Sequence, residues 1–259
     1  MFKTIRIFIL LFILAAVSYS GYRAKTQSVE WKYTLMVNVY PINGDGSEIA
    51  DDYISRLSHD EFASIEQFML DAAEEYGRAQ HASIQIRLQS KLAKRPPAPP
   101  ENANVVEIMW WSLQFRWWAY RNAKVQGPGT QVRLFVQYFD PQRQQVHHST
   151  ALQEGLIGQV NVFASADMRE KNNVVIAHEF LHTLGATDKY DLSTDFPIYP
   201  DGYAEPDKSP LHPQRFAEIM GGRLALNEFD AVIPNHLNRV VIGSKTAQEI
   251  NFLAKSESN

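Results

Sequence analysis

The spacing of apolar residues in the first half of the chain predicts two strands with a helix between them. Residues 31–40, WKYTLMVNVY, are typical of a strand, and residues 83–89, SIQIRLQ, alternate as a half-buried strand should. Between them, Ser58 and Glu61 have the spacing of a capping box, and apolar residues recur on one face as far as Gly77. We therefore expect a helix that begins at Ser58 and ends before Gly77.

The pattern further along the chain predicts a second helix, two strands and a third helix. We expect these elements over 105–124, 131–139, 156–163 and 171–184, with Gly185 as the C-terminal stop of the last helix. The order strand, helix, strand, helix, strand, strand, helix favours an α+β fold. In such a fold helices pack on a mixed twisted sheet, and the weaker pattern that follows predicts a smaller irregular C-terminal subdomain.

The N-terminal twenty residues differ from the rest of the chain. Lys3 and Arg6 precede an apolar run over 7–17, which as a helix would be about 16 Å long, against about 30 Å for the hydrocarbon core of a membrane. This pattern is typical of an export signal over 1–20, so we expect a periplasmic or secreted protein. An uncleaved anchor over 7–19 is the alternative, and it would hold the protein at a membrane.

Residues 21–259 show no linker, so we expect them to fold as a single, monomeric domain. Its N-terminal subdomain would cover 21–185 and its C-terminal subdomain 186–259. The net charge of −4 falls to −6 without 1–20, which carries two positive charges and no negative one, and this balance argues against a basic face for nucleic acid. The chain has no cysteine, so any metal must be held by His, Asp or Glu.

The third predicted helix contains the pentapeptide HEFLH at 178–182, which matches the HExxH zinc motif. His178 and His182 lie one helical turn apart on the same side, so both imidazoles can bind one tetrahedral zinc ion. Glu179 lies about 100° further around the helix axis, beside the open fourth position. There it can act as the general base that takes a proton from water.

Two later features extend this motif. A glycine in the left-handed conformation at Gly185 can end the helix and turn the chain back, so that Asp188, three residues on, can supply a third carboxylate ligand. The segment 216–222, FAEIMGG, then places Met220 between two loops. Alternatively, a distant glutamate completes the site, as in thermolysin-like enzymes, and the candidates are Glu205, Glu218 and Glu228.

At these residues the sequence resembles the metzincin clan of zinc metalloendopeptidases, which share the elongated motif HExxHxxGxx and a later Met-containing turn. The resemblance implies a metzincin-like zincin fold, one catalytic Zn²⁺ held by His178, His182 and Asp188, Glu179 as general base, and Met220 in the Met-turn. Most metzincins have His at the third position, and Asp188 is similar to the variant of snapalysin-type enzymes. Residues 185–190 are also similar to the aspartate motif of deuterolysin-like aspzincins, but the short gap after His182 favours the metzincin spacing.

The resemblance also implies supporting residues. Such enzymes use a Tyr or Arg to stabilise the oxyanion, and packing or surface roles are the alternative for the three candidates, Tyr190, Tyr203 and Arg223. In metzincins an antiparallel edge strand pairs with extended substrate. We assign that role to the strand 158–164, with an interior strand as the alternative; its substrate-facing residues would be Gln159, Val160, Asn161 and Val162.

We therefore expect an exported zinc metalloendopeptidase that acts on protein or peptide substrates. The alternatives are a zinc-binding envelope protein without turnover and an interaction protein built on the Trp-rich helix 105–124. In that helix Trp110, Trp111, Trp117 and Trp118 predict core packing, or alternatively a membrane or substrate surface. A calcium site among the acidic residues of 188–207 is a further alternative to a solvated loop.

Overall fold

The structure is a computed structural model of the chain. It describes residues 6, 19, 21–23, 26–78, 83–100, 103–124, 131–142, 149–153 and 155–254. The predicted export signal lies almost entirely outside these residues. In the described part no helix is both long enough and apolar enough to cross a membrane.

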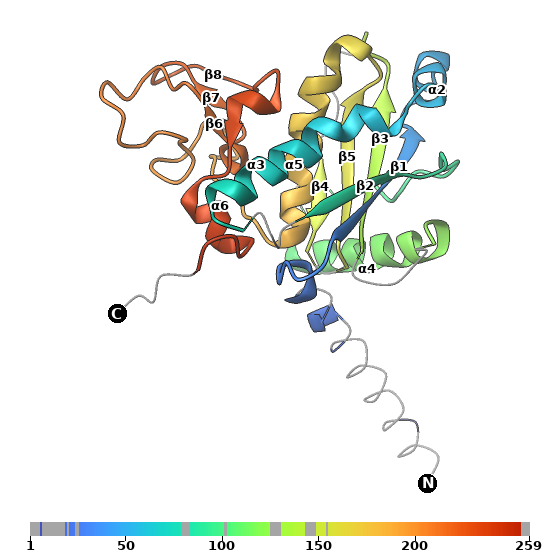
Figure 1. The fold of residues 1–259 in the computed structure, drawn as a ribbon. Helices are drawn as coiled ribbons and strands as arrows, with labels where there is room; N and C mark the ends of the chain where they lie inside the picture. The colour runs from blue at the N-terminus through green and yellow to red at the C-terminus, as the bar shows by residue number, and fades with distance from the viewer. Residues whose placement is uncertain are drawn as a thin grey trace.

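A five-stranded mixed sheet forms the centre of the molecule, in the order β2-β1-β3-β5-β4 (Figure 1). Four strands run parallel: β1 (Leu35–Asn43), β2 (Ile84–Leu88), β3 (Gln131–Phe139) and β5 (Ile157–Phe163). The fifth, β4 (Thr150–Leu152), pairs antiparallel with β5 at the edge of the sheet. The predicted α+β class and mixed sheet are confirmed.

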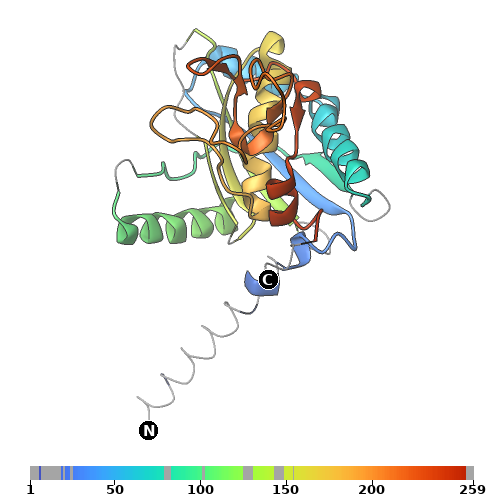
Figure 2. The same ribbon diagram turned by 90° about the vertical axis from the view of Figure 1, so that its left-hand side faces the viewer.

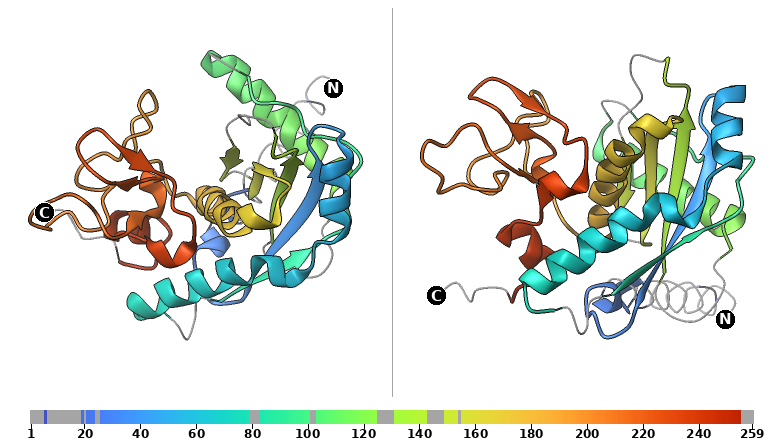
Figure 3. Two further views of the ribbon diagram at one scale, coloured as in Figure 1. Left: turned by 90° about the horizontal axis from the view of Figure 1, so that it is seen from above. Right: turned by 45° about the horizontal axis from the view of Figure 1, so that its top comes forward.

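Helices cover both faces of this sheet, because its strands carry apolar side chains on both sides. On one face lie α2 (Glu48–Ser55), α3 (Ala63–Glu75), which follows a 3-10 turn at His59–Phe62, and α5 (Arg169–Leu184), and they share one core with strand residues such as Val39 and Leu134. On the other face α4 (Val105–Asn122) packs on Tyr40 and Phe135 (Figure 3). The long helix α5 packs mainly on β5 and the edge strand β4 and is buried along most of its length.

The chain after α5 forms an irregular lobe on the side of α5 that faces away from the sheet (Figure 1). Its regular elements are short: β6 (Ala217–Glu218), β7 (Leu224–Ala225), β8 (Ala231–Val232), β9 (Val240–Val241), 3-10 turns at Ile219–Gly221 and Leu237–Arg239, and α6 (Ser244–Glu249). Met220, Ile242 and Phe252 belong to the same core as α5. The lobe and the sheet are therefore held together by continuous apolar packing.

One local prediction differs from the structure, and two short elements were not predicted. The Ser58 side chain makes no capping hydrogen bond, because a 3-10 turn precedes α3, and the capping box instead opens α4 at Asn104 and Glu107. Helix α2 and strand β4 were not predicted, since β4 has only three residues and α2 only eight. Both are too short for their spacing to stand out in the sequence.

The edge-strand prediction for 158–164 is wrong. Strand β5 lies inside the sheet, between β3 and β4, and Gln159, Val160 and Val162 are buried there. The segment before β5 turns back and pairs with it, so the free edge belongs to β4. Of the four residues assigned to substrate, Asn161 still borders the cavity described next.

Candidate metal centre

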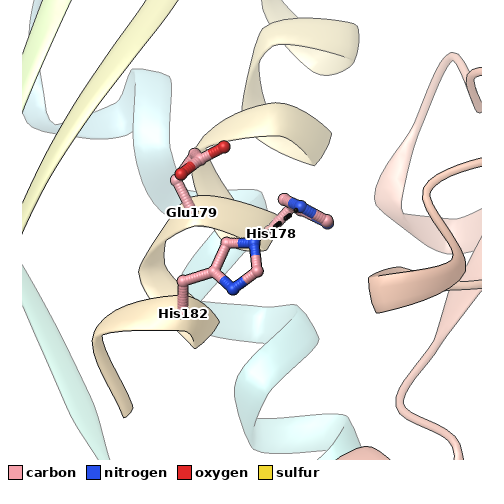
Figure 4. A group of neighbouring side chains, drawn as sticks. All are labelled: His178, Glu179 and His182. Atoms are coloured by element: carbon pink, nitrogen blue, oxygen red, sulfur yellow. Dashed lines mark hydrogen bonds between the residues drawn. The ribbon is translucent and has the colours of Figure 1, made fainter. Parts of the chain in front are cut away.

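Helix α5 carries His178 and His182, which point toward one another, and Glu179, which points to a different side of the helix, as Figure 4 shows. The Nε2 atoms of the two histidines lie 3.1 Å apart, and their rings are nearly perpendicular, at 89°. Helix α5 ends at Gly185, whose φ of 102° is left-handed, as the stop signal predicts. The chain reverses at this glycine, and the next residues run back beneath the histidines.

Asp188 lies at the end of that reversal and completes a triangle of ligand atoms. Its Oδ1 lies 3.2 Å from His178 Nε2 and 3.1 Å from His182 Nε2. Ligands of a tetrahedral zinc ion, at bond lengths of about 2.0 Å, lie about 3.3 Å from one another. The three donor atoms therefore have the spacing and the chemistry that a zinc ion requires.

The other ring nitrogen of each histidine meets a backbone carbonyl, which fixes the direction of the ring. His178 Nδ1 lies 2.9 Å from the carbonyl oxygen of Ile219, and His182 Nδ1 lies 2.8 Å from that of Ala186. A carbonyl only accepts hydrogen bonds, so each Nδ1 is the protonated donor. The Nε2 lone pairs of both histidines are therefore directed at the candidate metal position beside Asp188. In metal sites, hydrogen bonds of this kind to the second ring nitrogen orient the ligating histidine.

The ionisation of His182 and that of Asp188 depend on each other. Burial disfavours a charge on His182, but the hydrogen bond to Asp188 and the charges of Glu179 and Asp188 outweigh it and raise the pKa of His182 to about 9. Burial acts against ionisation of Asp188 as well, yet hydrogen bonds to His178 and His182 hold its pKa well below the ordinary value. The site thus attracts positive charge, and a metal cation would displace the His182 proton.

A cavity of about 240 Å³ opens beside the triangle. Its lining includes His178 and Glu179, and Glu179 is 5% exposed. One carboxylate oxygen of Glu179 lies within 4.8 Å of the ligand atoms of both histidines. Much of the remaining wall is apolar, with Val174, Val175, Ile219 and Ile233 among its residues. A carboxylate therefore faces a partly apolar cleft next to the candidate metal position.

Two of the three candidate oxyanion donors line this cavity. The Tyr190 ring lies 6.2 Å from the His178 ring, and the Tyr190 pKa is raised by burial and by the charges of Asp188 and Glu179. Arg223 also lines the cavity, where its guanidinium lies 2.6 Å from Asp195 Oδ2. Tyr203 is placed elsewhere: its hydroxyl lies 3.4 Å from His212 Nε2, and it is not among the lining residues.

Met220 is fully buried in the 3-10 turn Ile219–Gly221, directly against α5. The same turn supplies the carbonyl that orients His178, and the Met220 carbonyl accepts a hydrogen bond of 2.8 Å from the Lys189 amide. The turn thus contacts both the zinc helix and the loop that carries Asp188.

Glu218 has a structural role that the sequence does not reveal. Its carboxylate accepts hydrogen bonds from Gly221 N at 2.7 Å, from Gly243 N at 3.1 Å and from Thr246 Oγ1 at 2.7 Å. It is completely buried and joins the Met220 turn to α6. Among the other thermolysin-type candidates, Glu205 pairs with Arg215 and Glu228 is exposed. The carboxylate oxygen that lies beside both histidine Nε2 atoms belongs to Asp188.

Lys189 and Glu249 hold the loop that carries Asp188. The Lys189 ammonium lies 2.8 Å from Glu249 and also donates to the Thr187 carbonyl at 2.8 Å. Glu249 in turn accepts hydrogen bonds from the backbone and the hydroxyl of Thr187. Of the acidic residues further along, Asp191 accepts hydrogen bonds from Ser193 and Thr194 within its own turn, and Asp195 pairs with Arg223.

Comparison with known proteins gives limited similarity. No protein-family model matches the sequence, and no curated protein matches it. One similar solved structure is a zinc-dependent peptidase from Methanocorpusculum labreanum, with 11% identity, a TM-score of 0.38, and coverage of 83% of this chain and 100% of that one. Another is OgpA from Akkermansia muciniphila, with 14% identity, a TM-score of 0.37, and coverage of 88% and 65%. At these TM-scores neither similarity establishes a common fold.

Proposed function

We propose that this protein is a metzincin-like, zinc-dependent endopeptidase that acts outside the cytoplasm. The observation that carries the proposal is the triangle of His178 Nε2, His182 Nε2 and Asp188 Oδ1, with sides of 3.1 to 3.2 Å, next to a cavity that Glu179 lines. These three side chains would hold the zinc ion. When bound, zinc supplies Lewis-acid activation of water and of the substrate carbonyl.

Glu179 is the general base of this proposal. Its carboxylate removes a proton from the attacking water, whose oxygen forms the new bond to the carbonyl carbon. The same carboxyl group then donates that proton to the nitrogen of the breaking C–N bond, so the leaving group departs as a neutral amine. Burial of Glu179 beside the histidines keeps the carboxylate within reach of both transfers.

Tyr190 is the favoured oxyanion donor. Its phenol is protonated at neutral pH, as in any tyrosine, so its hydroxyl can donate a hydrogen bond to the negative charge that develops on the carbonyl oxygen. Arg223 stands further along the cavity wall, where its ion pair with Asp195 already uses part of its hydrogen-bonding capacity. We propose that Arg223 contributes to the shape and the charge of the cleft and does not act as the oxyanion donor.

Substrate would lie extended along β4, the antiparallel edge of the sheet. The outer edge of β4 is the side turned away from β5, and Ser149, the residue before β4, lines the cavity together with Asn161. An added peptide strand there would form main-chain hydrogen bonds that do not depend on its side chains. The sheet order, the reversal at Gly185 and the buried Met220 turn support the metzincin-like part of the proposal.

Metal analysis combined with a proteolysis assay tests this function. The purified full chain should contain one zinc ion per molecule and cleave a mixture of unstructured peptides. Glu179→Gln should keep the zinc and lose about 10²–10⁴-fold in rate, because only the base is removed. A chain without stoichiometric zinc contradicts the proposal. Zinc binding without any turnover in the wild type would instead favour a non-catalytic zinc protein.

A further inference from the structure

Helix α4 has apolar residues on two opposite sides, and only one side is covered. Trp111, Phe115 and Ala119 are buried against the sheet. The opposite side carries a row of exposed apolar residues that we call the α4 outer face. It consists of Val106, Met109, Trp110, Leu113, Trp117 and Tyr120, all between 54% and 74% exposed.

The spacing of the α4 outer face defines a continuous surface. At 100° per residue, these six side chains fall within a sector of about 100°, on the side of the helix opposite Phe115. The rings of Trp117 and Tyr120 stack at 5.9 Å along this sector. The prediction that the four tryptophans pack in the core therefore holds for Trp111 and for the partly buried Trp118, whose ring lies 4.9 Å from that of Phe135. Trp110 and Trp117, in contrast, are 63% and 61% exposed.

The charges of α4 indicate what kind of partner covers this face. The chain as a whole is acidic, at −4, but α4 and its C-terminal end carry Arg116, Arg121 and Lys124 against the single carboxylate of Glu107. Glu107 is used in the capping box, and Arg121 lies 5.8 Å from the Trp117 ring. Exposed tryptophans flanked by arginine and lysine are typical of helices that lie in the interface of an anionic membrane.

The position of α4 in the fold also favours a membrane as the partner. The described N-terminal residues leave the domain at its lower end in Figures 1 and 2, which is the end where α4 lies. Those residues connect to the apolar run over 7–17, with Lys3 and Arg6 before it. In the uncleaved-anchor alternative, a membrane that receives this run would therefore lie next to α4. The candidate metal centre is on the other face of the sheet, so its cavity would stay open.

We propose that the α4 outer face is a membrane-docking surface that lies in the headgroup region of an anionic lipid bilayer. Trp110, Leu113 and Trp117 would enter the boundary between headgroups and acyl chains, while Arg121 and Lys124 meet lipid phosphates. The proposal depends neither on zinc nor on hydrolysis. It places the cleft of the protein close to a membrane surface, within reach of substrates that are held there.

The absence of cysteine provides a direct test. Leu113→Cys in the full chain accepts a single environment-sensitive fluorophore on the α4 outer face, and Leu192→Cys, 79% exposed in the irregular lobe, is the matched control. Both proteins are reconstituted with phosphatidylcholine vesicles, with and without phosphatidylglycerol. We expect the label at 113 to shift to the blue and to be quenched by brominated lipid in the anionic vesicles, while the label at 192 does not change.

Two double variants complete the test. Trp110→Ser with Trp117→Ser should abolish the shift, and Arg121→Gln with Lys124→Gln should move the docking equilibrium about 30-fold toward the undocked state. Thermal unfolding of each variant shows that the domain is still folded. An unshifted label in anionic vesicles overturns the proposal. So does an equal shift in neutral vesicles, or a shift without lipid that grows with protein concentration, which would assign the face to a second copy of the chain.

Discussion

The carboxylate of Glu249 lies 2.8 Å from the ammonium of Lys189, across 60 residues of sequence. Asp188 directly precedes this lysine, so the ion pair between α6 and the loop determines where the third donor atom lies. Both partners are largely buried, with side chains 5% and 18% exposed. The geometry of the candidate metal centre therefore depends on a helix that contributes no ligand.

Glu249→Gln should weaken zinc binding by about 10–100-fold, the usual effect of removing an outer contact that orients a ligand. The Gln side chain keeps the shape of Glu249 but loses the charge that holds Lys189. Competition with a fluorescent zinc chelator measures the affinity. The control is Glu30→Gln, which removes an exposed ion pair with Lys32 and should leave the affinity unchanged. Equal affinity in both variants would contradict the positioning role.

The metal-free protein should lose stability as pH rises from about 6.5 to about 9. The folded-state pKa of His182 is raised from 6.5 to about 9, so its contribution is fully present below 6.5 and is lost as the pH passes through 9. Asp188, whose pKa is lowered, adds stability that disappears only in strong acid. Thermal unfolding after chelation should show this decline, and His182→Asn should remove it. A flat profile in the wild type would refute the coupling.

The affinity of the protein for zinc should change with pH in the opposite direction to the stability of the metal-free protein. Because the metal must displace the His182 proton, its apparent affinity should rise with pH up to about 9 and then level off. Zinc titrations at a series of pH values measure this slope. Asp188→Ala should reduce the affinity strongly, whereas Asp191→Ala, in the same loop, should not, since Asp191 bonds only within its own turn. If the Asp191 variant lost zinc and the Asp188 variant did not, the third ligand would be Asp191 and not Asp188.

Glu218→Ala should destabilise the fold by about 3 kcal/mol or more, because three buried donors lose their acceptor. The loss should extend to the Met220 turn and lower zinc affinity indirectly. Denaturant unfolding measures the stability. Glu228→Ala is the matched control, since Glu228 is exposed and its replacement should change neither the stability nor the zinc affinity. A Glu228 variant that loses zinc would support a thermolysin-type ligand set.

Tyr190→Phe should lower kcat by about 10²-fold with little change in KM, because in the proposed mechanism the phenol, which hydrogen-bonds Asp188 in the structure, donates to the charge that develops in the transition state. Tyr203→Phe serves as the control, since Tyr203 faces His212 and lies outside the cavity lining. Steady-state kinetics on one cleaved peptide separates the two parameters. A change confined to KM would make Tyr190 a binding residue.

Predictions from local sequence patterns were reliable where a single helix or strand determines how the residues are arranged. His178 and His182 face the same way because a helix brings residues four apart to the same side, and any helix at this place would do so. Gly185 ends α5 because its left-handed φ is easily reached only without a side chain. The strand over 131–139 also has the predicted bounds. These features follow from rules that act over a few residues.

Other predictions failed because they depended on neighbours distant in the sequence. The assignment of β5 to the sheet edge failed because β4, a strand of three residues, covers that edge. Trp110 and Trp111 are adjacent and chemically identical, yet one is 63% and the other 6% exposed. The sequence shows that the helix is apolar on both sides, but it does not show which side meets the sheet.

The sequence by itself determined the order of most elements, the pair of histidines and the residues able to complete a zinc site. Only the tertiary structure decided that Asp188 reaches them, that Glu218 supports the Met220 turn, and that Tyr190 rather than Tyr203 faces the cavity. The physical reason is the range of the forces involved. Helix geometry and glycine conformation are local, whereas burial and ion pairing such as Lys189 with Glu249 require the whole chain to be packed.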